Sequence, residues 1–122
     1  MTNSRKISET LIDFAKPLIE TINSDSTEQE VQAGFTIAVA VWNACVLATV
    51  RNDNRFLQNL CSLAQAGGNE PEAQKMIDTL IDRKNGLFGD DLRGIGDTTV
   101  TFKNGCLNVK AEARLVDGLK IN

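Results

Sequence analysis

The side chains that carry most enzyme chemistry are scarce in this chain, which has 122 residues and no histidine. Its three cysteines, Cys45, Cys61 and Cys106, have spacings that match no zinc site. Cys45 and Cys61 lie in apolar surroundings and are interpreted as buried thiols, whereas Cys106 is expected to be exposed. Without a histidine partner, no thiol is set up as a nucleophile. This use of cysteine is typical of a reducing compartment.

Carboxylates are the next candidates for chemistry. Asp78, Asp82, Asp90, Asp91 and Asp97 supply the oxygen ligands that Mg²⁺ and Ca²⁺ prefer, and the first two share one helix face. No twelve-residue calcium loop is present, however, and basic residues stand close enough to neutralise these acids. We therefore interpret them as a solvated face with surface ion pairs and expect no cofactor. A carboxylate-based metal-binding enzyme stays as an alternative.

Arg83, Lys84 and Arg93 form a candidate basic patch. The glycines of residues 83–89 also suggest an anion cradle, but the segment lacks Walker A spacing and a preceding strand, so helix capping explains them better. The 13 Lys and Arg against 16 Asp and Glu give a net charge of −3, which argues against a general nucleic-acid binder. A nucleic-acid or ribosome-associated accessory protein would need a local patch and is a second alternative. Its candidate cations are Arg83, Lys84, Arg93, Lys103, Lys110 and Arg114.

Trp42 and Asn43 stand out within the apolar run of residues 35–50. That run is shorter than the roughly 18–20 residues that cross a bilayer, so it predicts a buried central helix rather than a membrane span. An unpaired buried amide costs about 1–3 kcal/mol. Asn43 is therefore either a ligand or register contact or, as we favour, an amide bonded to neighbouring backbone. Trp42 is expected in the core or at a dimer interface, because a helix that is apolar all round needs partners.

The elements that must position these residues follow from periodicity and caps. A first helix starts near Ser8 and is interrupted at Pro17. A second spans residues 27–49 behind a capping box, for which Ser26 with Gln29 and Thr27 with Glu30 are both candidates. The third ends at Gly67-Gly68, and the fourth begins at Pro71. The sequence thus predicts an α+β fold in one domain, residues 1–122. About four N-terminal helices, within residues 8–88, precede a C-terminal antiparallel β-hairpin.

The hairpin is predicted over residues 97–116, where the apolar period falls to two. Asn104-Gly105 is the typical sequence of a type I′ turn. A two-residue loop pairs Phe102 with Leu107 and Val100 with Val109, which places the apolar side chains on one face. Because a lone two-stranded ribbon is marginal in water, we expect that face to pack on the helices.

Two segments carry a family resemblance. The sequence FAKPLI at residues 14–19, followed by AVWN at residues 40–43, and the stretch of residues 80–95 that leads into the strand pair resemble the helical part of bacterial SEC-C-motif-containing proteins. The zinc-binding Cys/His tail of those proteins has no counterpart here, so the resemblance brings no metal function and no catalytic residues. It implies a bacterial cytoplasmic protein.

The favoured interpretation is a non-enzymatic protein-interaction module in the bacterial cytoplasm, with a protein partner or a homodimer. The polar N-terminus MTNSRKISET does not read as a signal peptide, and no membrane association is expected. Nucleic acid is the less favoured partner.

Overall fold

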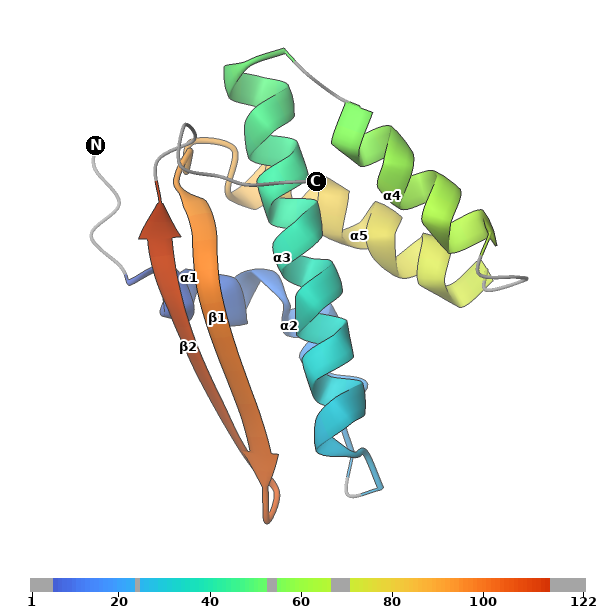
Figure 1. The fold of residues 1–122 in the computed structure, drawn as a ribbon, viewed down its shortest axis with the longest axis vertical. Helices are drawn as coiled ribbons and strands as arrows, with labels where there is room; N and C mark the ends of the chain where they lie inside the picture. The colour runs from blue at the N-terminus through green and yellow to red at the C-terminus, as the bar shows by residue number, and fades with distance from the viewer. Residues whose placement is uncertain (1–5, 24, 53–54, 67–70, 115–122) are drawn as a thin grey trace.

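The computed structural model describes residues 6–23, 25–52, 55–66 and 71–114. Within them, five helices are followed by an antiparallel two-stranded hairpin that packs on the helical part (Figure 1), which confirms the predicted α+β class. The elements, in chain order, are α1 (Ile7–Phe14), α2 (Lys16–Ile19), α3 (Glu28–Val50), α4 (Arg55–Ala66), α5 (Pro71–Leu87), β1 (Gly94–Lys103) and β2 (Cys106–Arg114).

The first predicted helix is split into α1 and α2 at Ala15, because Pro17 has no N–H to donate to Asp13 four residues earlier. The Arg83 guanidinium of α5 takes over that role. Its Nη2 donates to the Asp13 carbonyl (2.7 Å) and its Nε donates to the Phe14 carbonyl (3.0 Å). The break is thereby satisfied by a residue 70 positions away along the chain.

Helix α3 begins behind the second of the two capping boxes that the sequence offers, Thr27 with Glu30. The Thr27 hydroxyl accepts from the Glu30 N–H (3.1 Å), while the Glu30 carboxylate accepts from the Thr27 N–H (3.0 Å). The helix continues for 23 residues and is therefore longer than the apolar run alone. By length and composition alone α3 could also cross a membrane; half of its most apolar window is buried inside the domain.

The hairpin has the predicted turn and register. Asn104 and Gly105 have φ of 54° and 76°, as a type I′ turn requires, and the pairs Phe102–Leu107 and Val100–Val109 form. The start of the hairpin was predicted three residues too late, because β1 already begins at Gly94. A bulge between Ile95 and Thr98 shifts the register of β1 against β2 by one residue there. Residues 94–96, which precede the predicted hairpin, are part of the strand, and Asn43 of α3 binds the backbone of Ile95 there, as described below.

Helix α3 occupies the centre of the domain. It runs along β1, while α5 and α4 lie on its other side and α1 packs against β2 (Figure 1). The largest side chains with almost no exposure come from four elements and meet on this helix: Leu11, Phe14, Phe35, Trp42, Leu80 and Ile95. Residues 35–50 thus lie in the central helix of the domain, as predicted.

The capping box yields a first prediction. Thr27→Ala removes the side-chain acceptor of the Glu30 N–H and should lower the free energy of unfolding by about 1 kcal/mol. Urea denaturation followed by circular dichroism measures the change. Thr27→Ser keeps the hydroxyl and is the matched control, which should stay within about 0.5 kcal/mol of the wild type. Equal losses in the two variants would contradict the role of the hydroxyl.

Candidate functional site

Side chains of α3 cover the outer edge of β1, the edge that faces away from β2. In an antiparallel pair, every second residue points its N–H and C=O away from the partner strand. Val100 and Phe102 are such residues. The Gln32 amide donates to the Val100 carbonyl (2.9 Å), and the Phe102 N–H donates to the Glu28 carboxylate (3.0 Å). The helix thus supplies hydrogen bonds where a third strand would otherwise pair.

The spacing of these contacts follows from the geometry of a helix beside a strand. Four helical residues, from Glu28 to Gln32, rise about 6 Å. Two strand residues, from Phe102 to Val100, span about 6.7 Å. Because α3 and β1 run in opposite directions, each step of four along the helix matches a step of two back along the strand.

Asn43 makes the same kind of contact at the other end of β1. Its Nδ2 donates to the Ile95 carbonyl (2.9 Å), and its Oδ1 accepts from the Ile95 N–H (2.8 Å). The residue is only 7% exposed, so both bonds lie in the interior. Asn43 is therefore a buried amide bonded to neighbouring backbone. We call the bonds of Glu28, Gln32 and Asn43 to β1 the edge ladder.

Trp42 lies in the core and not on the surface of the domain. Its side chain has no exposed area, and its Nε1 donates to the Arg93 carbonyl (2.7 Å). Edge-to-face contact with Phe14 and a tilted contact with Phe88, with ring centroids 5.2 and 5.7 Å away, complete its surroundings. The expectation of a dimer interface at Trp42 does not fit this placement, because the helix finds its partners within the chain.

Lys84 is 2% exposed and cannot contribute to a surface patch. Its Nζ donates to the carbonyls of Phe88 (2.7 Å) and Asp91 (2.9 Å) and lies 4.5 Å from the centre of a Trp42 ring. Burial lowers the pKa of Lys84, and the charge of Asp91 opposes that shift. The ammonium group therefore caps the end of α5 and the turn that follows it.

Cys45 lies close enough to Lys84 to interact with its charge. Burial nevertheless raises the pKa of the Cys45 thiol to about 11, against the opposing effect of Lys84. At neutral pH the thiol is protonated and is not a nucleophile. Cys106 is exposed, as predicted, and the Cys61 side chain lies outside those described.

Arg93 is held by Asp91. Its Nε and Nη2 donate to the two carboxylate oxygens (2.9 and 2.7 Å), and Nη2 also approaches the Thr10 hydroxyl (3.3 Å). Burial alone would raise the pKa of Asp91, but the hydrogen bonds from Arg93 and the charges of Arg93 and Lys84 hold it below its ordinary value. With Arg83 bound to the α1 break, all three predicted basic-patch residues make structural contacts.

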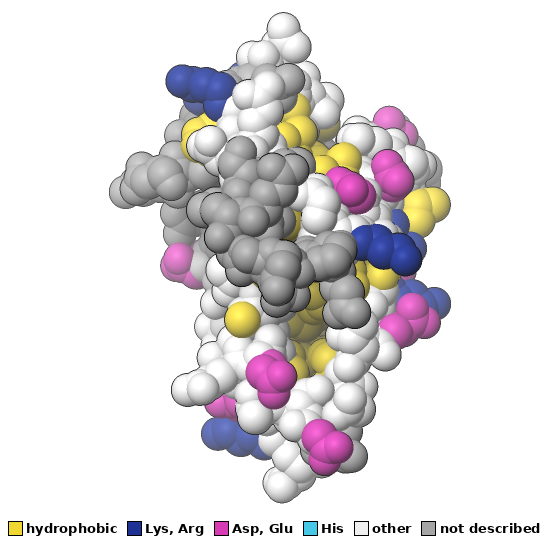
Figure 2. Space-filling view, turned by 90° about the vertical axis from the view of Figure 1, so that its right-hand side faces the viewer, with side chains coloured by type: hydrophobic (Ala, Val, Ile, Leu, Met, Phe, Trp, Pro, Cys, Tyr) yellow, Lys and Arg dark blue, Asp and Glu magenta, His cyan; other side chains and the backbone are white. Residues whose placement is uncertain are grey.

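The predicted acidic residues are not brought together as a cation site. Asp78 accepts from the Gln74 amide (2.9 Å), Asp91 binds Arg93, and Asp82 and Asp90 are exposed. Within the described ranges, no group of three or more His, Cys, Asp and Glu is placed to hold a metal ion. Figure 2 shows Lys and Arg side chains interspersed with Asp and Glu on the face that it presents.

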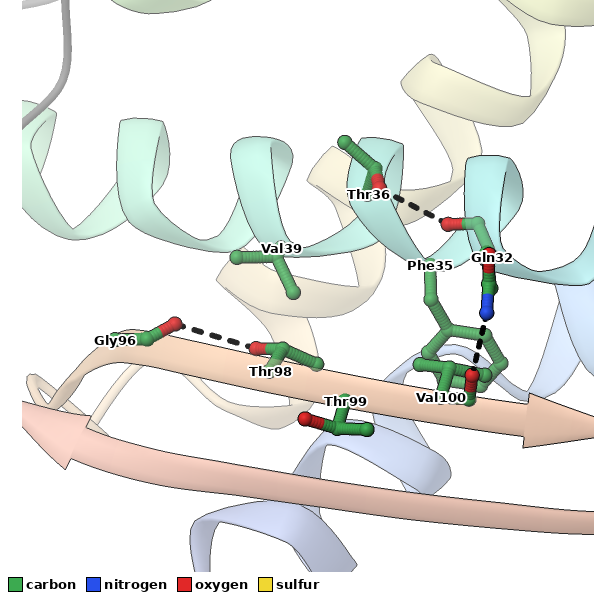
Figure 3. A pocket seen from close by; sticks show the side chains of 8 residues that line it. All are labelled: Gln32, Phe35, Thr36, Val39, Gly96, Thr98, Thr99 and Val100. Atoms are coloured by element: carbon green, nitrogen blue, oxygen red, sulfur yellow. Dashed lines mark hydrogen bonds between the residues drawn. The ribbon is translucent and has the colours of Figure 1, made fainter. Parts of the chain in front are cut away.

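A cavity of about 440 Å³ lies between α3 and β1, in the middle of the edge ladder (Figure 3). We call it the α3–β1 groove. None of its lining residues ionises; they are Gln32, Phe35, Thr36, Val39, Gly96, Thr98, Thr99 and Val100. Sequence reasoning missed this site. The available signal was Gln32 followed by Thr36 on the helix, two polar residues one turn apart beside an apolar stripe.

Comparisons with protein-family models, with curated proteins and with solved structures gave no match. The function of the chain is therefore inferred from its geometry.

Asn43 offers a test of the edge ladder. Asn43→Ala leaves the N–H and C=O of Ile95 without their partner. Each unsatisfied buried group costs about 1–3 kcal/mol, so the free energy of unfolding should fall by about 2–6 kcal/mol. Gln32→Ala, which removes one half-buried bond, should cost only about 0.5–1.5 kcal/mol. Urea denaturation gives both values, and amide exchange of Ile95 should accelerate only in Asn43→Ala. A similar fall in the free energy of unfolding in both variants would contradict the larger contribution of Asn43 to stability.

The fall in the free energy of unfolding at acid pH should reveal the contribution of the Asp91–Arg93 ion pair to stability. Because the pKa of Asp91 is lowered in the folded state, its contribution to stability is complete above the unfolded value of about 3.9 and is lost as pH falls through the folded value. Asp91→Asn should therefore flatten the fall in stability below about pH 4. Asp82→Asn, on the exposed face of α5, is the control and should keep the wild-type slope. The check is a series of urea curves from pH 6 to pH 2.5.

Proposed function

We propose that this protein is a non-enzymatic protein-interaction module of the bacterial cytoplasm and that the α3–β1 groove is its recognition surface. The observation that supports this most is the groove itself. It opens onto the outer edge of β1, at a point where the helix does not complete the hydrogen bonding of that edge. Exposed strand edges are common docking sites for other polypeptides.

The lining of the groove favours binding over catalysis. It contains amide, hydroxyl and apolar groups but no acid, base or thiol that could transfer a proton or attack a substrate. A volume of about 440 Å³ lies within the range of roughly 300–1,000 Å³ that is typical of ligand sites. The groove can therefore hold a segment of a partner by shape and hydrogen bonding.

The two alternatives have less support. For a nucleic-acid accessory protein, three of the six candidate cations, Arg83, Lys84 and Arg93, are bound to carbonyls or to Asp91. Lys103 and Lys110 are exposed on the hairpin, but they are two charges in a chain of net charge −3, and the Arg114 side chain lies outside those described. A carboxylate-based metal enzyme would need acids gathered around one point, and the described acidic residues are dispersed or paired. Neither alternative has a specific observation in its favour.

The proposal is tested by photo-cross-linking in the native host. A benzoylphenylalanine at Thr99, which lines the groove, should yield an adduct with a polypeptide, identified by mass spectrometry. The same probe at Asp82, exposed on α5, should not. Thr36→Arg places a long cation in the groove and should abolish the adduct at position 99.

The outcomes separate clearly. An adduct that depends on the groove supports the module, and an adduct with twice the mass of the chain identifies the partner as a second copy. Equal adducts at positions 99 and 82, an adduct insensitive to Thr36→Arg, or no adduct at position 99 would each count against the proposed function. Thermal denaturation of Thr36→Arg verifies that the domain stays folded.

A further inference from the structure

The edge ladder is interrupted at one position. Counting four residues on from Gln32 gives Thr36, and counting two residues back from Val100 gives Thr98. By the spacing of the ladder, these two residues should face each other across the groove. Both residues line it, and Figure 3 shows the open space between helix and strand at this point.

Thr36 does not extend the ladder, because its side chain is short and otherwise engaged. Its hydroxyl donates to the Gln32 carbonyl within the helix (2.9 Å; Figure 3). Val39, the next residue of α3 that points toward the strand, is apolar. In the part of the chain that the structure describes, no hydrogen bond from α3 reaches the Thr98 backbone.

Thr98 also has its N–H and C=O directed into the groove rather than toward β2. The two-residue turn makes Lys103–Cys106 a pair that exchanges main-chain hydrogen bonds. Hydrogen-bonded and non-hydrogen-bonded pairs alternate along the hairpin from there, and Thr98–Ala111 is a non-hydrogen-bonded pair. Gln32 and Glu28, which bind Val100 and Phe102, occupy the same side of the strand. The groove therefore presents one donor and one acceptor of a strand edge, side by side.

We propose that the α3–β1 groove binds an extended segment of a partner protein, one residue of which pairs its main-chain N–H and C=O with those of Thr98. This inference rests on the proposed function and specifies its ligand. The partner residue completes the edge ladder in the way that the Asn43 amide completes it at Ile95. Pairing of an added strand with an exposed edge is an established mode of peptide recognition.

The chemistry of the groove favours a peptide over other ligands. Binding both groups of Thr98 requires a neutral donor and acceptor at amide spacing, and the bonds of Asn43 to Ile95 show that this chain already uses that solution. The lining offers no counter-charge to an ionic ligand. Phe35, Val39 and Val100 supply apolar contacts for the side chains beside the paired residue.

The flanking bonds limit the length of the contact. Gln32 already occupies the Val100 carbonyl, and Asn43 occupies both groups of Ile95. A bound strand can therefore pair only around Thr98 and must leave the groove on either side. A contact this short implies weak intrinsic affinity for a small peptide, because few groups offset the cost of association.

The test uses the full chain, labelled with ¹⁵N, and the capped peptide acetyl-Ala-Val-Ala-amide. Titration to several millimolar should move the amide resonances of Thr98 and Val100 and slow the exchange of the Thr98 amide at least threefold. Thr36→Gln repeats Gln32 one turn along, fills the open position and should weaken binding at least tenfold. Thr36→Val, the matched control, leaves the position open and should bind within twofold of the wild type.

Several results would overturn the inference. One is that the peptide leaves the amide resonance of Thr98 unmoved. Another is that neither Thr36→Gln nor Val39→Gln, a second variant meant to fill the open position, weakens peptide binding. A third is that Thr36→Val weakens binding as much as Thr36→Gln does. A Thr98 amide that already exchanges as slowly as that of Ile95 without peptide would show that the chain fills the position itself. A concentration-dependent shift without peptide would identify a second copy as the occupant.

Failure of this inference is distinguishable from failure of the proposed function. If the adduct at position 99 forms and is lost in Thr36→Arg, but the peptide leaves Thr98 unmoved, the module binds its partner by another mode. If the adduct is also absent, the groove is not a recognition surface.

Discussion

The hydrogen bonds between Asn43 and Ile95 are the contact on which the rest of the arrangement depends. A two-stranded ribbon is marginally stable by itself and needs support from other elements. Asn43 supplies it from the middle of the most apolar helix, with a donor and an acceptor that match one residue of β1. This contact sets the level of α3 along the strand, so Gln32 and Glu28 meet Val100 and Phe102 further down.

The charged residues show a second constraint, which is the supply of partners for carbonyl groups at helix ends. Arg83 binds the carbonyls near the break between α1 and α2, and Lys84 binds those of the turn after α5. A lysine at 2% exposure is unusual and is tolerated here because two carbonyls and the Trp42 ring replace its water. These cations therefore hold helices together rather than recognise an anion.

Local rules accounted for the elements of this fold but not for its site. The capping box at Thr27, the interruption at Pro17 and the turn at Asn104-Gly105 each act over a few residues, so the sequence predicts them directly. The early start of β1 was missed because Ile95 is extended by a residue 52 positions away. The groove depends on the alignment of α3 with β1, which no short segment encodes. Lys84 likewise resembles a surface cation until its distant neighbours are known.

The long reach of the edge ladder has a consequence for synthesis of the chain. Its contacts join residues 52, 68 and 74 positions apart, so β1 leaves the ribosome well after α3. At about 5–20 residues per second, Asn43 waits about 3–10 s for Ile95. During that interval the apolar stripe that will meet the hairpin is uncovered. The core is therefore closed only after the hairpin has emerged and met α3.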